Sequence, residues 1–596
     1  MNTCDIERPL PQAGEGWGEG KPVSAAPSLF LTPGPSPACG KGEKTLETAV
    51  SFPPFEPWQW NLPNRFNIGV ACTDVHLGTP VQDKLAMIVE DDELGVSTAT
   101  YRQLAEATSR FAQLLRNLGV RTEDRVLIRL PNSLAYPTAF LGAMKRGAIA
   151  VPTSTLLTAE EVAYLAKDSG AAVLVTDKAM WAGLRDKLHG LESLRYVLLA
   201  GEGVPAFYNG NGLKVLGLEA SLATIDTWDA PYPTRPQDPA YLVYTSGTTG
   251  YPKGVLHAHR AMIGREPASK YWFDFGTEGA PEDDRIVHSG KFNWTYVLGS
   301  GLMDPLYRGK TVIVHEGRND AEGWIKLIAK HAATLFIGVP TIYRQILQKT
   351  AFTGADAPTL RHCMSAGEHL SDEMLTLWRE RFGMDIYEAV GMSEVSYYLS
   401  ENRFRPIKPG SAGFPQPGHG VKLLDPETLG EVATGEEGMI CLPADDPGLF
   451  LRYWNLPEET GKAFKEGWFL TGDYARFDED GYIWFLGRKD DIINSFGYRV
   501  SPHEIERVMK THPAVADCAA TGEELAADKV LVVAYVVLHA GATATPDELL
   551  AFGREHLAGY KAPRIVYQAA DFPCTKNGKI IRKQLRPEIA VARSSN

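Results

Sequence analysis

The run from Tyr244 to Gly254 gathers small, hydroxylated and cationic residues in one short loop. Glycines let a backbone approach an anion closely, Ser and Thr hydroxyls donate to phosphate oxygens, and Lys253 adds a positive charge. The stretch therefore predicts a site for a nucleotide triphosphate. The candidate phosphate-binding residues are Thr245, Ser246, Gly247, Thr248, Thr249, Gly250 and Lys253.

The loop follows a short apolar run, residues 240–244, that Pro239 precedes. This pattern predicts a buried strand that ends at the loop. A Walker-type phosphate loop would end in Gly-Lys-Ser or Gly-Lys-Thr, whereas this one ends in Pro252-Lys253-Gly254, so that class is excluded. A plain surface loop is the remaining structural alternative, and the length and order of the motif disfavour it.

Further polar motifs occur at intervals after the glycine loop. Ser365-Ala366-Gly367-Glu368 follows an apolar strand, which puts it where open α/β sheets bind ligands. On its own, this tetrapeptide could equally be an ordinary turn from a strand to a helix. The other motifs lie at residues 387–394, 468–473, 487–494, 497–500 and 575–582.

Taken in order, these motifs resemble those of adenylate-forming enzymes, the superfamily of acyl-CoA synthetases, firefly luciferase and peptide-synthetase adenylation domains. The resemblance runs from about residue 52 to 590. It implies that a carboxylate and MgATP give an acyl-adenylate and pyrophosphate, after which a thiol releases AMP. Splitting the reaction into two steps lowers each barrier, because AMP is a good leaving group when the thiol attacks the acyl-adenylate.

The resemblance also implies roles for residues of the nucleotide site. Gly367 and Glu368 match the adenine-binding loop, and Glu394 matches the carboxylate that holds Mg²⁺ on the triphosphate, although Ser393 stands where Thr is usual. By the same match, Asp473 is expected to accept hydrogen bonds from both ribose hydroxyls, and Arg488 is expected to contact the ribose.

The last motifs imply a moving C-terminal part. Asp490 matches the hinge, Gly497 and Tyr498 match the loop that lines the CoA thiol arm, and Arg499 is expected to meet a phosphate. A charged joint flanked by glycine suits rigid-body rotation. Lys579 matches the lysine whose ammonium stabilises charge during adenylation. The predicted catalytic residues are Lys579, Thr245 and Glu394.

Free CoA is the predicted acceptor, because residues 491–505 look more like medium-chain and aromatic acyl-CoA synthetases than luciferases. The alternative is a stand-alone adenylation enzyme that loads an acyl carrier protein. Aromatic, cyclic and medium-chain acids remain comparable as substrates. The acid pocket is expected to involve Trp294, Gly338, Val390 and Gly391, with Lys291, Phe292, Asn293 and Thr295 beside Trp294.

Composition limits the other classes of function. There are 60 Lys and Arg against 73 Asp and Glu, a net charge of −13, which argues against nucleic acid or an anionic membrane as the main partner. The seven scattered cysteines are typical of a reduced, metal-free protein. No window of about twenty apolar residues predicts a membrane span, so we expect a cytoplasmic protein without stable membrane insertion. His257 and His259 are interpreted as structural, since they lack a nearby third ligand.

The pattern predicts an α/β fold in three parts. Residues 1–48 are a Pro- and Gly-rich tail that is expected to be disordered, and either a functional tail or an initiation codon assigned too far upstream explains it. Residues 49–488 form a large domain of parallel-sheet α/β layers with a barrel-like antiparallel piece after about residue 400. Residues 489–596 form a small, mobile α+β domain. Helices are predicted at 101–118, 135–145, 160–167, 502–510 and 546–557. Strands are predicted at 125–130, 148–151, 171–176, 311–314, 334–338, 361–365, 413–420, 438–442, 530–538 and 564–569.

Overall fold

The computed structural model describes residues between 55 and 594, with short gaps. The gaps are 202, 206–207, 210–212, 246–251, 319, 368–369, 489–490, 492, 496–497, 527–528, 558, 560 and 575–579. Side chains are also left out at 208–209, 494, 498–499, 504, 525–526 and 529. The predicted tail, residues 1–48, lies outside the described residues.

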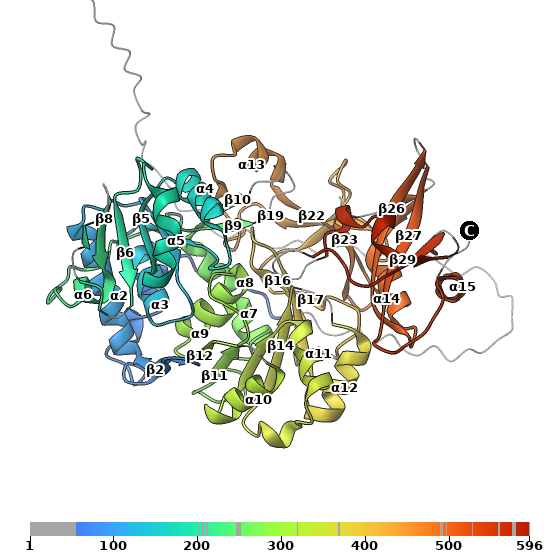
Figure 1. Ribbon diagram of the computed structural model, residues 1–596, viewed down its shortest axis with the longest axis horizontal. Helices are drawn as coiled ribbons and strands as arrows, with labels where there is room; N and C mark the ends of the chain where they lie inside the picture. The colour runs from blue at the N-terminus through green and yellow to red at the C-terminus, as the bar shows by residue number, and fades with distance from the viewer. Residues whose placement is uncertain are drawn as a thin grey trace, which may run out of the picture. The chain divides into compact units, whose positions relative to one another are not determined.

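Two nine-stranded sheets, built from residues between 85 and 453, form the larger part of the fold (Figure 1). In both, the central strands are parallel and the outer strands antiparallel, which confirms the predicted α/β class. The first sheet, in spatial order, is β17 (Phe414–Pro415), β16 (Tyr397–Ser400), β15 (Ile386–Gly391), β14 (His362–Ala366), β13 (Leu335–Gly338), β11 (Arg285–His288), β12 (Thr311–Glu316), β1 (Leu85–Asp91) and β2 (Gly95–Thr100). The second is β20 (Arg452–Tyr453), β10 (Lys253–Ala258), β9 (Pro239–Thr245), β4 (Ile149–Pro152), β3 (Arg125–Arg129), β5 (Ala171–Asp177), β6 (Tyr196–Ala200), β8 (Lys214–Gly217) and β7 (Tyr208–Asn209).

Helices cover both sheets and share a core between them. The helices α2 (Tyr101–Asn117) and α3 (Ala135–Lys145) lie in the cluster that the two sheets share, and α4 (Ala159–Ser169) and α5 (Lys178–Leu188) pack on the other face of the second sheet. The outer face of the first sheet carries α10 (Ala321–Lys330), α11 (Pro340–Lys349) and α12 (Asp372–Phe382). The shorter helices are α1 (Ile68–Ala71), α6 (Leu218–Leu222), α7 (Glu266–Tyr271), α8 (Thr295–Leu298), α9 (Asp304–Tyr307) and α13 (Pro457–Ala463).

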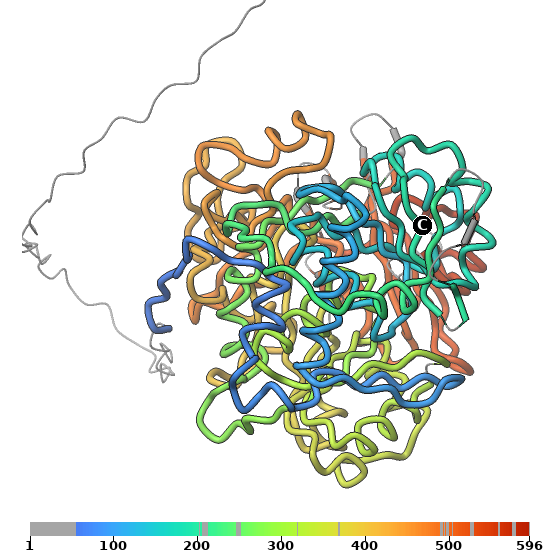
Figure 2. The backbone as a smooth tube through the Cα atoms, turned by 90° about the vertical axis from the view of Figure 1, so that its left-hand side faces the viewer, coloured from blue at the N-terminus to red at the C-terminus, as the bar shows by residue number. Residues whose placement is uncertain are grey.

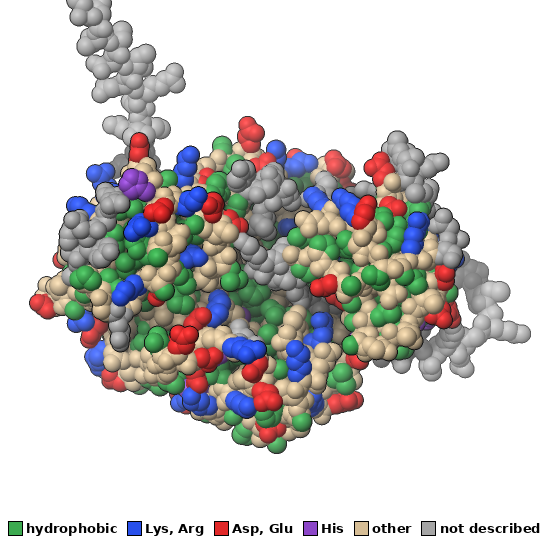
Figure 3. All heavy atoms as spheres, viewed as in Figure 1, with side chains coloured by type: hydrophobic (Ala, Val, Ile, Leu, Met, Phe, Trp, Pro, Cys, Tyr) green, Lys and Arg blue, Asp and Glu red, His purple; other side chains and the backbone are tan. Residues whose placement is uncertain are grey.

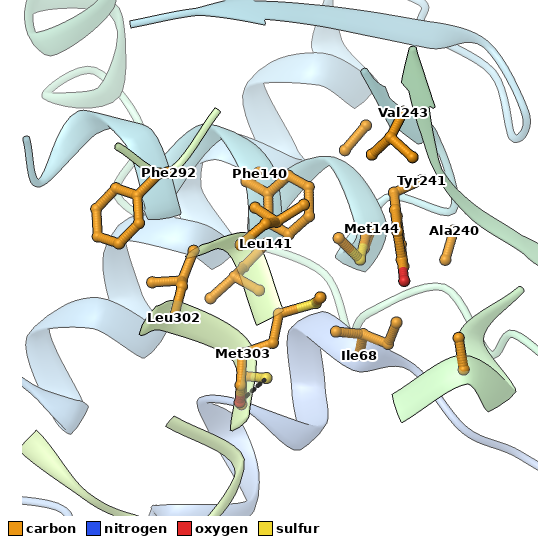
Figure 4. Close-up of a cluster of buried hydrophobic side chains, with 14 of the residues drawn as sticks. Ile68, Phe140, Leu141, Met144, Ala240, Tyr241, Val243, Phe292, Leu302 and Met303 are labelled. Carbon is orange, nitrogen blue, oxygen red and sulfur yellow. Dashed lines mark hydrogen bonds between the residues drawn. The ribbon is translucent and has the colours of Figure 1, made fainter. Parts of the chain in front are cut away.

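The shared core explains why these segments are helical. Thr100 caps α2, since its side chain accepts from the Gln103 N–H while the Gln103 side chain accepts from the Thr100 N–H. In α3, Phe140 and Met144 lie beside Tyr241 of β9 (Figure 4), and the Phe140 and Tyr241 ring centroids are 6.1 Å apart. Burying a large apolar side chain of this kind contributes about 1.5–3 kcal/mol to folding.

The segment from residue 85 to 100 joins the first sheet from far away in the sequence. β1 pairs in parallel with β12 and antiparallel with β2. Figure 2 shows this blue hairpin running beside the green and yellow parts of the chain. Because the partner strand is more than 200 residues away, local sequence pattern could not predict the pairing.

The expected antiparallel piece is a five-stranded sheet. Its strands are β18 (Lys422–Leu424), β19 (Gly438–Pro443), β21 (Phe464–Lys465), β22 (Trp468–Phe477) and β23 (Ile483–Arg488). The predicted strand at 413–420 is wrong in extent, since only the two residues of β17 are extended and paired. Gly418 and Gly420 have positive φ angles, +97° and +55°, and turn the chain away.

The C-terminal part is a separate α+β module. It contains α14 (Pro502–Lys510), α15 (Pro546–His556) and a sheet of β26 (Val515–Ala526), β27 (Lys529–Leu538), β28 (Ile565–Ala569) and β29 (Ala590–Arg593), preceded by the hairpin β24 (Ile493–Ser495) and β25 (Tyr498–Val500). Ile505 and Met509 of α14 and Leu549 of α15 pack on one face of this sheet. The bounds of α14 agree with the predicted helix.

The charge on the surface and the hydropathy of the helices both bear on possible partners. On the face drawn in Figure 3, Lys and Arg side chains are interspersed with Asp and Glu. Within the described ranges, no helix combines the length and apolar character needed to cross a membrane.

Candidate functional site

The predicted phosphate loop connects two antiparallel strands. Thr245, at the end of β9, lies directly across the ladder from Lys253, the first residue of β10. The loop residues Ser246, Gly247, Thr248, Thr249 and Gly250 lie outside the described residues. A Walker-type loop connects a strand to a helix. The hairpin therefore agrees with the exclusion of that class from the sequence.

Lys253 is held at the mouth of this hairpin by a neighbouring segment. Its Nζ lies 3.1 Å from Glu459 Oε2, and 5.5 Å from the centroid of the Tyr453 ring. The Lys253 side chain is 20% exposed. A lysine in this position is a cation that a phosphate group can reach.

Glu394 lies close to the same segment. Its Oε1 accepts a hydrogen bond of 2.7 Å from the Tyr453 hydroxyl, and its backbone oxygen accepts one of 2.8 Å from the Phe450 N–H. Burial, together with the charge of Glu394, raises the pKa of Tyr453, so its hydroxyl is a neutral donor. Contacts to both the side chain and the backbone of Glu394 thus orient its carboxylate.

Buried polar groups fix the turn on either side of Glu394. His257 of β10 contacts the backbone oxygen of Ser393 through Nε2 at 2.7 Å. Burial lowers the pKa of His257 to about 4, so the ring is neutral and Nε2 carries the hydrogen that it donates. On the other side, the buried Arg265 donates to Ser396 Oγ and forms two bonds with Asp304, at 2.8 and 2.7 Å.

The second histidine of the predicted structural pair also has a backbone partner. Nδ1 of His259 accepts a hydrogen bond of 3.0 Å from the Ile68 N–H. Both imidazoles are buried, with exposed fractions of 2% and 0% for His257 and His259. These contacts agree with a structural role, and His257 in addition joins the phosphate hairpin to the Glu394 turn.

The two predicted ribose residues are partners in the structure. Asp473 of β22 and Arg488 of β23 face each other across an antiparallel ladder, and Arg488 Nε lies 3.2 Å from Asp473 Oδ1. Asp473 follows Gly472, whose φ of +76° lies in the left-handed region that favours glycine. The Arg488 side chain is 56% exposed, so it presents a charge beside the buried carboxylate.

Three of the predicted acid-pocket residues, Gly338, Val390 and Gly391, lie at the carboxyl ends of β13 and β15, parallel strands on either side of β14. Gly338 of β13 pairs with Ser365 of β14, and Ala366 pairs with Ala389 of β15, the residue before Val390. Open α/β sheets bind ligands at such strand ends.

Two details of this region explain its glycines and its tryptophan. A Cβ added at Gly391 would lie 2.3 Å from the backbone oxygen of Ser396, so the turn toward Glu394 excludes a side chain there. Trp294 lies just before α8, and its ring is 3.6 Å from the position of a Cβ at Gly367. The predicted pocket residue therefore borders the predicted adenine loop.

The neighbours of Trp294 have other contacts. Lys291 Nζ is 2.7 Å from Glu316 Oε2, so this charge is paired. Phe292 is fully buried in the central cluster (Figure 4), 5.2 Å from the ring of Tyr136. Its side chain therefore belongs to the core, and its predicted place in the pocket is corrected, because the ring packs against α3.

Several predicted residues are not described. Glu368, Asp490, Gly497 and Lys579 lie outside the described residues. Tyr498 and Arg499 are described only by their backbone, in β25. Their assignments remain predictions from the sequence.

Sequence reasoning missed Tyr453 and Glu459, which touch Glu394 and Lys253. Tyr453 reaches the site because β20 pairs with β10, opposite Val255, about 200 residues earlier in the chain. Pro457 at the start of α13 is the local signal for a helix start, but no local signal indicates that its Glu459 faces Lys253.

Comparison with known proteins identifies the family. Residues 78–454 match the model described as AMP-binding enzyme, and residues 504–579 match AMP-binding enzyme C-terminal domain. The chain is 33% identical over 491 residues to benzoate–CoA ligase from Thauera aromatica, covering 82% of this chain and 90% of that protein.

Solved structures give the same result. An anthranilate CoA ligase in complex with anthranoyl-AMP superposes with a TM-score of 0.76 and 30% identity, over 87% of this chain and 96% of that one. A benzoate CoA ligase from Burkholderia xenovorans LB400 has a TM-score of 0.75 and 30% identity, over 87% and 100% of the two chains. The chain therefore belongs to the AMP-binding enzyme family, the adenylate-forming superfamily that its motifs resemble.

Proposed function

We propose that the protein is an AMP-forming acid–CoA ligase, which activates a carboxylic acid with ATP and transfers the acyl group to CoA. One observation carries this proposal. The described cationic and anionic groups that adenylation needs, Lys253 and Glu394, are linked through Tyr453, which lies within reach of both. Relatives that align over most of both chains are named CoA ligases.

In the first step, a carboxylate oxygen of the acid attacks the α-phosphorus of ATP and pyrophosphate leaves. Lys253 and the hydroxyls of residues 245–249 would hold the phosphates, while Asp473 and Arg488 would hold the ribose. Lys579 would stabilise the charge that grows on the α-phosphate, a role for which a fixed cation is effective. The acid and the nucleotide would thus meet with their reacting atoms oriented.

Glu394 fits a magnesium ion by its chemistry. It is a carboxylate that is 8% exposed, with one oxygen oriented by Tyr453, and Mg²⁺ is usually bound through one or two carboxylates and substrate phosphates. When bound, the ion would neutralise charge on the triphosphate. Holding Glu394 in place is the task of Tyr453, His257 and the backbone of Phe450.

In the second step, the CoA sulfur attacks the acyl carbonyl carbon, the bond between the carbonyl carbon and AMP breaks, and the thiol proton passes to solvent. We propose that residues 49–488 and 489–596 are separate domains and that rotation about Asp490 exchanges Lys579 for the loop of Gly497 and Tyr498. Arg499 would then meet a phosphate. Domain rotation at a short hinge is a common way to assemble two sites in turn.

An aromatic acid is the proposed substrate class. Trp294 and Tyr296 lie edge to face, with ring centroids 5.3 Å apart, beside the glycine-rich strand ends. Flat rings pack well against such aromatic walls. The names of similar proteins, which include benzoate, 3-hydroxybenzoate and anthranilate CoA ligases, support the same class.

The test is formation of AMP and acyl-CoA by the purified protein with MgATP and CoA. The acids to compare are benzoate, hydroxybenzoates, cyclohexane carboxylate and straight-chain acids. We expect a thioester and stoichiometric AMP with a benzoate. AMP without a thioester would instead indicate a carrier-protein acceptor, and the absence of AMP with every acid would refute the ligase assignment.

A further inference from the structure

Glu459 lies between two lysines beside the predicted phosphate loop. Its Oε2 is 3.1 Å from Lys253 Nζ, and its Oε1 is 2.9 Å from Lys462 Nζ. Hydrogen bonds from these two lysines, Lys462 first, lower the pKa of Glu459, so the carboxylate is charged at neutral pH. One anion therefore already neutralises the lysine that the sequence assigns to phosphate.

The segment that carries Glu459 is attached to the hairpin by its backbone. Leu451 N–H donates to Leu256 O and Trp454 N–H donates to Gly254 O, each at 2.7 Å. Thr460 Oγ1 accepts from the Tyr453 N–H at 3.0 Å, which ties the start of α13 to β20. Paired backbone thus brings the start of α13 beside β10 and places Glu459 within reach of Lys253.

We propose that Glu459 is an internal counter-ion that competes with the triphosphate of ATP for Lys253. The proposal rests on the proposed function, since it concerns the same nucleotide site. A phosphate bound at Lys253 Nζ would lie within a few ångströms of the Glu459 carboxylate, and like charges at that range repel. Exchange of one anion for the other relieves this repulsion.

Lys462 makes the exchange possible without leaving a charge unpaired. It binds the other oxygen of Glu459, and its side chain is 70% exposed. When a phosphate takes Lys253, Glu459 keeps Lys462 as its partner. When pyrophosphate leaves, Glu459 can pair with Lys253 again. The same ion pair that weakens ATP binding would therefore favour release of pyrophosphate.

The experiment measures binding of inorganic tripolyphosphate and of ATP by calorimetry at fixed magnesium and low salt. It compares the wild type with Glu459→Gln and with Glu458→Gln, a control with the same charge change one residue away on the same helix, whose side chain is exposed. We expect Glu459→Gln to lower Kd about two- to fivefold, the range for a partly exposed ion pair, and Glu458→Gln to leave it unchanged. The difference should shrink as salt is added.

A second variant tests the role of Lys462. In Lys462→Gln, Glu459 loses its alternative partner, so Kd for tripolyphosphate should rise. Equal Kd values for Glu459→Gln and Glu458→Gln would overturn the proposal, and weaker binding in Glu459→Gln would overturn it in favour of Glu459 as a support for Lys253. Acid-dependent AMP release by the wild type separates these results from a failure of the ligase assignment, which would abolish that release.

Discussion

The acid-binding end of the proposed site is made of strand ends without charge, whereas the triphosphate end is made of charged side chains held by one another. At the acid end, Gly338 of β13 and Val390 of β15 come from parallel strands on either side of β14, and the register of these strands fixes them. At the triphosphate end, Lys253 and Glu394 come from segments about 140 residues apart and meet through Tyr453.

The difference indicates how each end recognises its ligand. The backbone and glycines at the acid end would select the acid by its shape. A single methyl group added there should therefore change kcat/KM for the acid. Ion pairs at the triphosphate end can be exchanged for phosphate, so each contact there should change affinity only modestly. Changes at one end should therefore leave the Michaelis constant for the other ligand almost unaltered.

The largest effect is expected for Lys579→Ala, which tests a charge that belongs to neither binding end. Loss of one fixed group that stabilises transition-state charge typically costs on the order of hundreds-fold in rate. We expect kcat for acid-dependent pyrophosphate release to fall by about this factor, with KM for ATP and for the acid nearly constant. A rise in KM for ATP with unchanged kcat would instead assign Lys579 to nucleotide binding.

Within the triphosphate end, His257 joins the phosphate hairpin to the Glu394 turn, and its protonation should cost stability. Its pKa is lowered from 6.5 to about 4, mainly by burial and further by Arg265 and Arg260. A base whose pKa is lower in the folded state gives stability that is complete above pH 6.5 and declines as the pH falls toward 4. The decline contributed by one such group is about 1.4 kcal/mol per pH unit.

The measurement is urea unfolding between pH 7.5 and 4.5 for the wild type and His257→Gln. Glutamine retains an N–H donor for Ser393 O but takes up no proton in this range. We expect the variant to lose less stability than the wild type as the pH falls. Parallel curves for the two proteins would show that His257 does not titrate differently on folding.

Gly338→Ala tests the acid end alone. A Cβ at this position would lie 3.1 Å from Tyr343 Cε2 and 3.4 Å from Phe336 Cε1, two fully buried rings of the core on the outer face of the sheet, so the end of β13 must shift slightly. Such a shift would change the shape of the predicted acid pocket, where a difference of one methylene is worth about tenfold or more in kcat/KM. We expect this loss for the acid, with KM for ATP unchanged. Gly183→Ala on α5, where an added Cβ meets nothing within 4 Å, is the control.

The sequence alone predicts more of the proposed acid end than of the triphosphate end. The strands 334–338 and 361–365 were predicted within one residue of β13 and β14, because continuous apolar runs identify buried parallel strands. Their carboxyl ends then follow from the fold class. The strand ends of the proposed acid end could therefore be predicted from the pattern, whereas the burial of Phe292 depends on packing against α3.

The triphosphate end could be predicted only in part. Lys253 and Glu394 were identified from motifs, but Tyr453 reaches them through a two-residue strand, β20, that no periodicity reveals. Glu459 depends in turn on where that strand places α13. Charge pairs between segments that are distant in sequence depend on which strands pair in the folded protein, such as β20 with β10. The composition of the sequence does not indicate them.

The smallest effect is expected for Tyr453→Phe, which removes one hydroxyl from the triphosphate end and keeps the ring. Phe450 packs against this ring at 4.8 Å between centroids, and that contact should persist. The lost hydrogen bond to Glu394 leaves the carboxylate less well oriented, which is worth about three- to tenfold for a bond to a charged group that solvent partly reaches. We expect KM for MgATP to rise by this factor while KM for the acid stays constant.

Tyr307→Phe is the control that decides the interpretation. Tyr307 also donates to a glutamate, Glu266 Oε1, at 2.7 Å, but it lies outside the proposed site. If loss of a partly buried Tyr–Glu bond acted only through stability, both variants would lower the melting temperature and neither would change KM for ATP. A change in KM confined to Tyr453→Phe, and reduced at higher magnesium concentration, would instead locate the effect at Glu394. It would also show that the triphosphate end, unlike the acid end, depends on contacts between side chains.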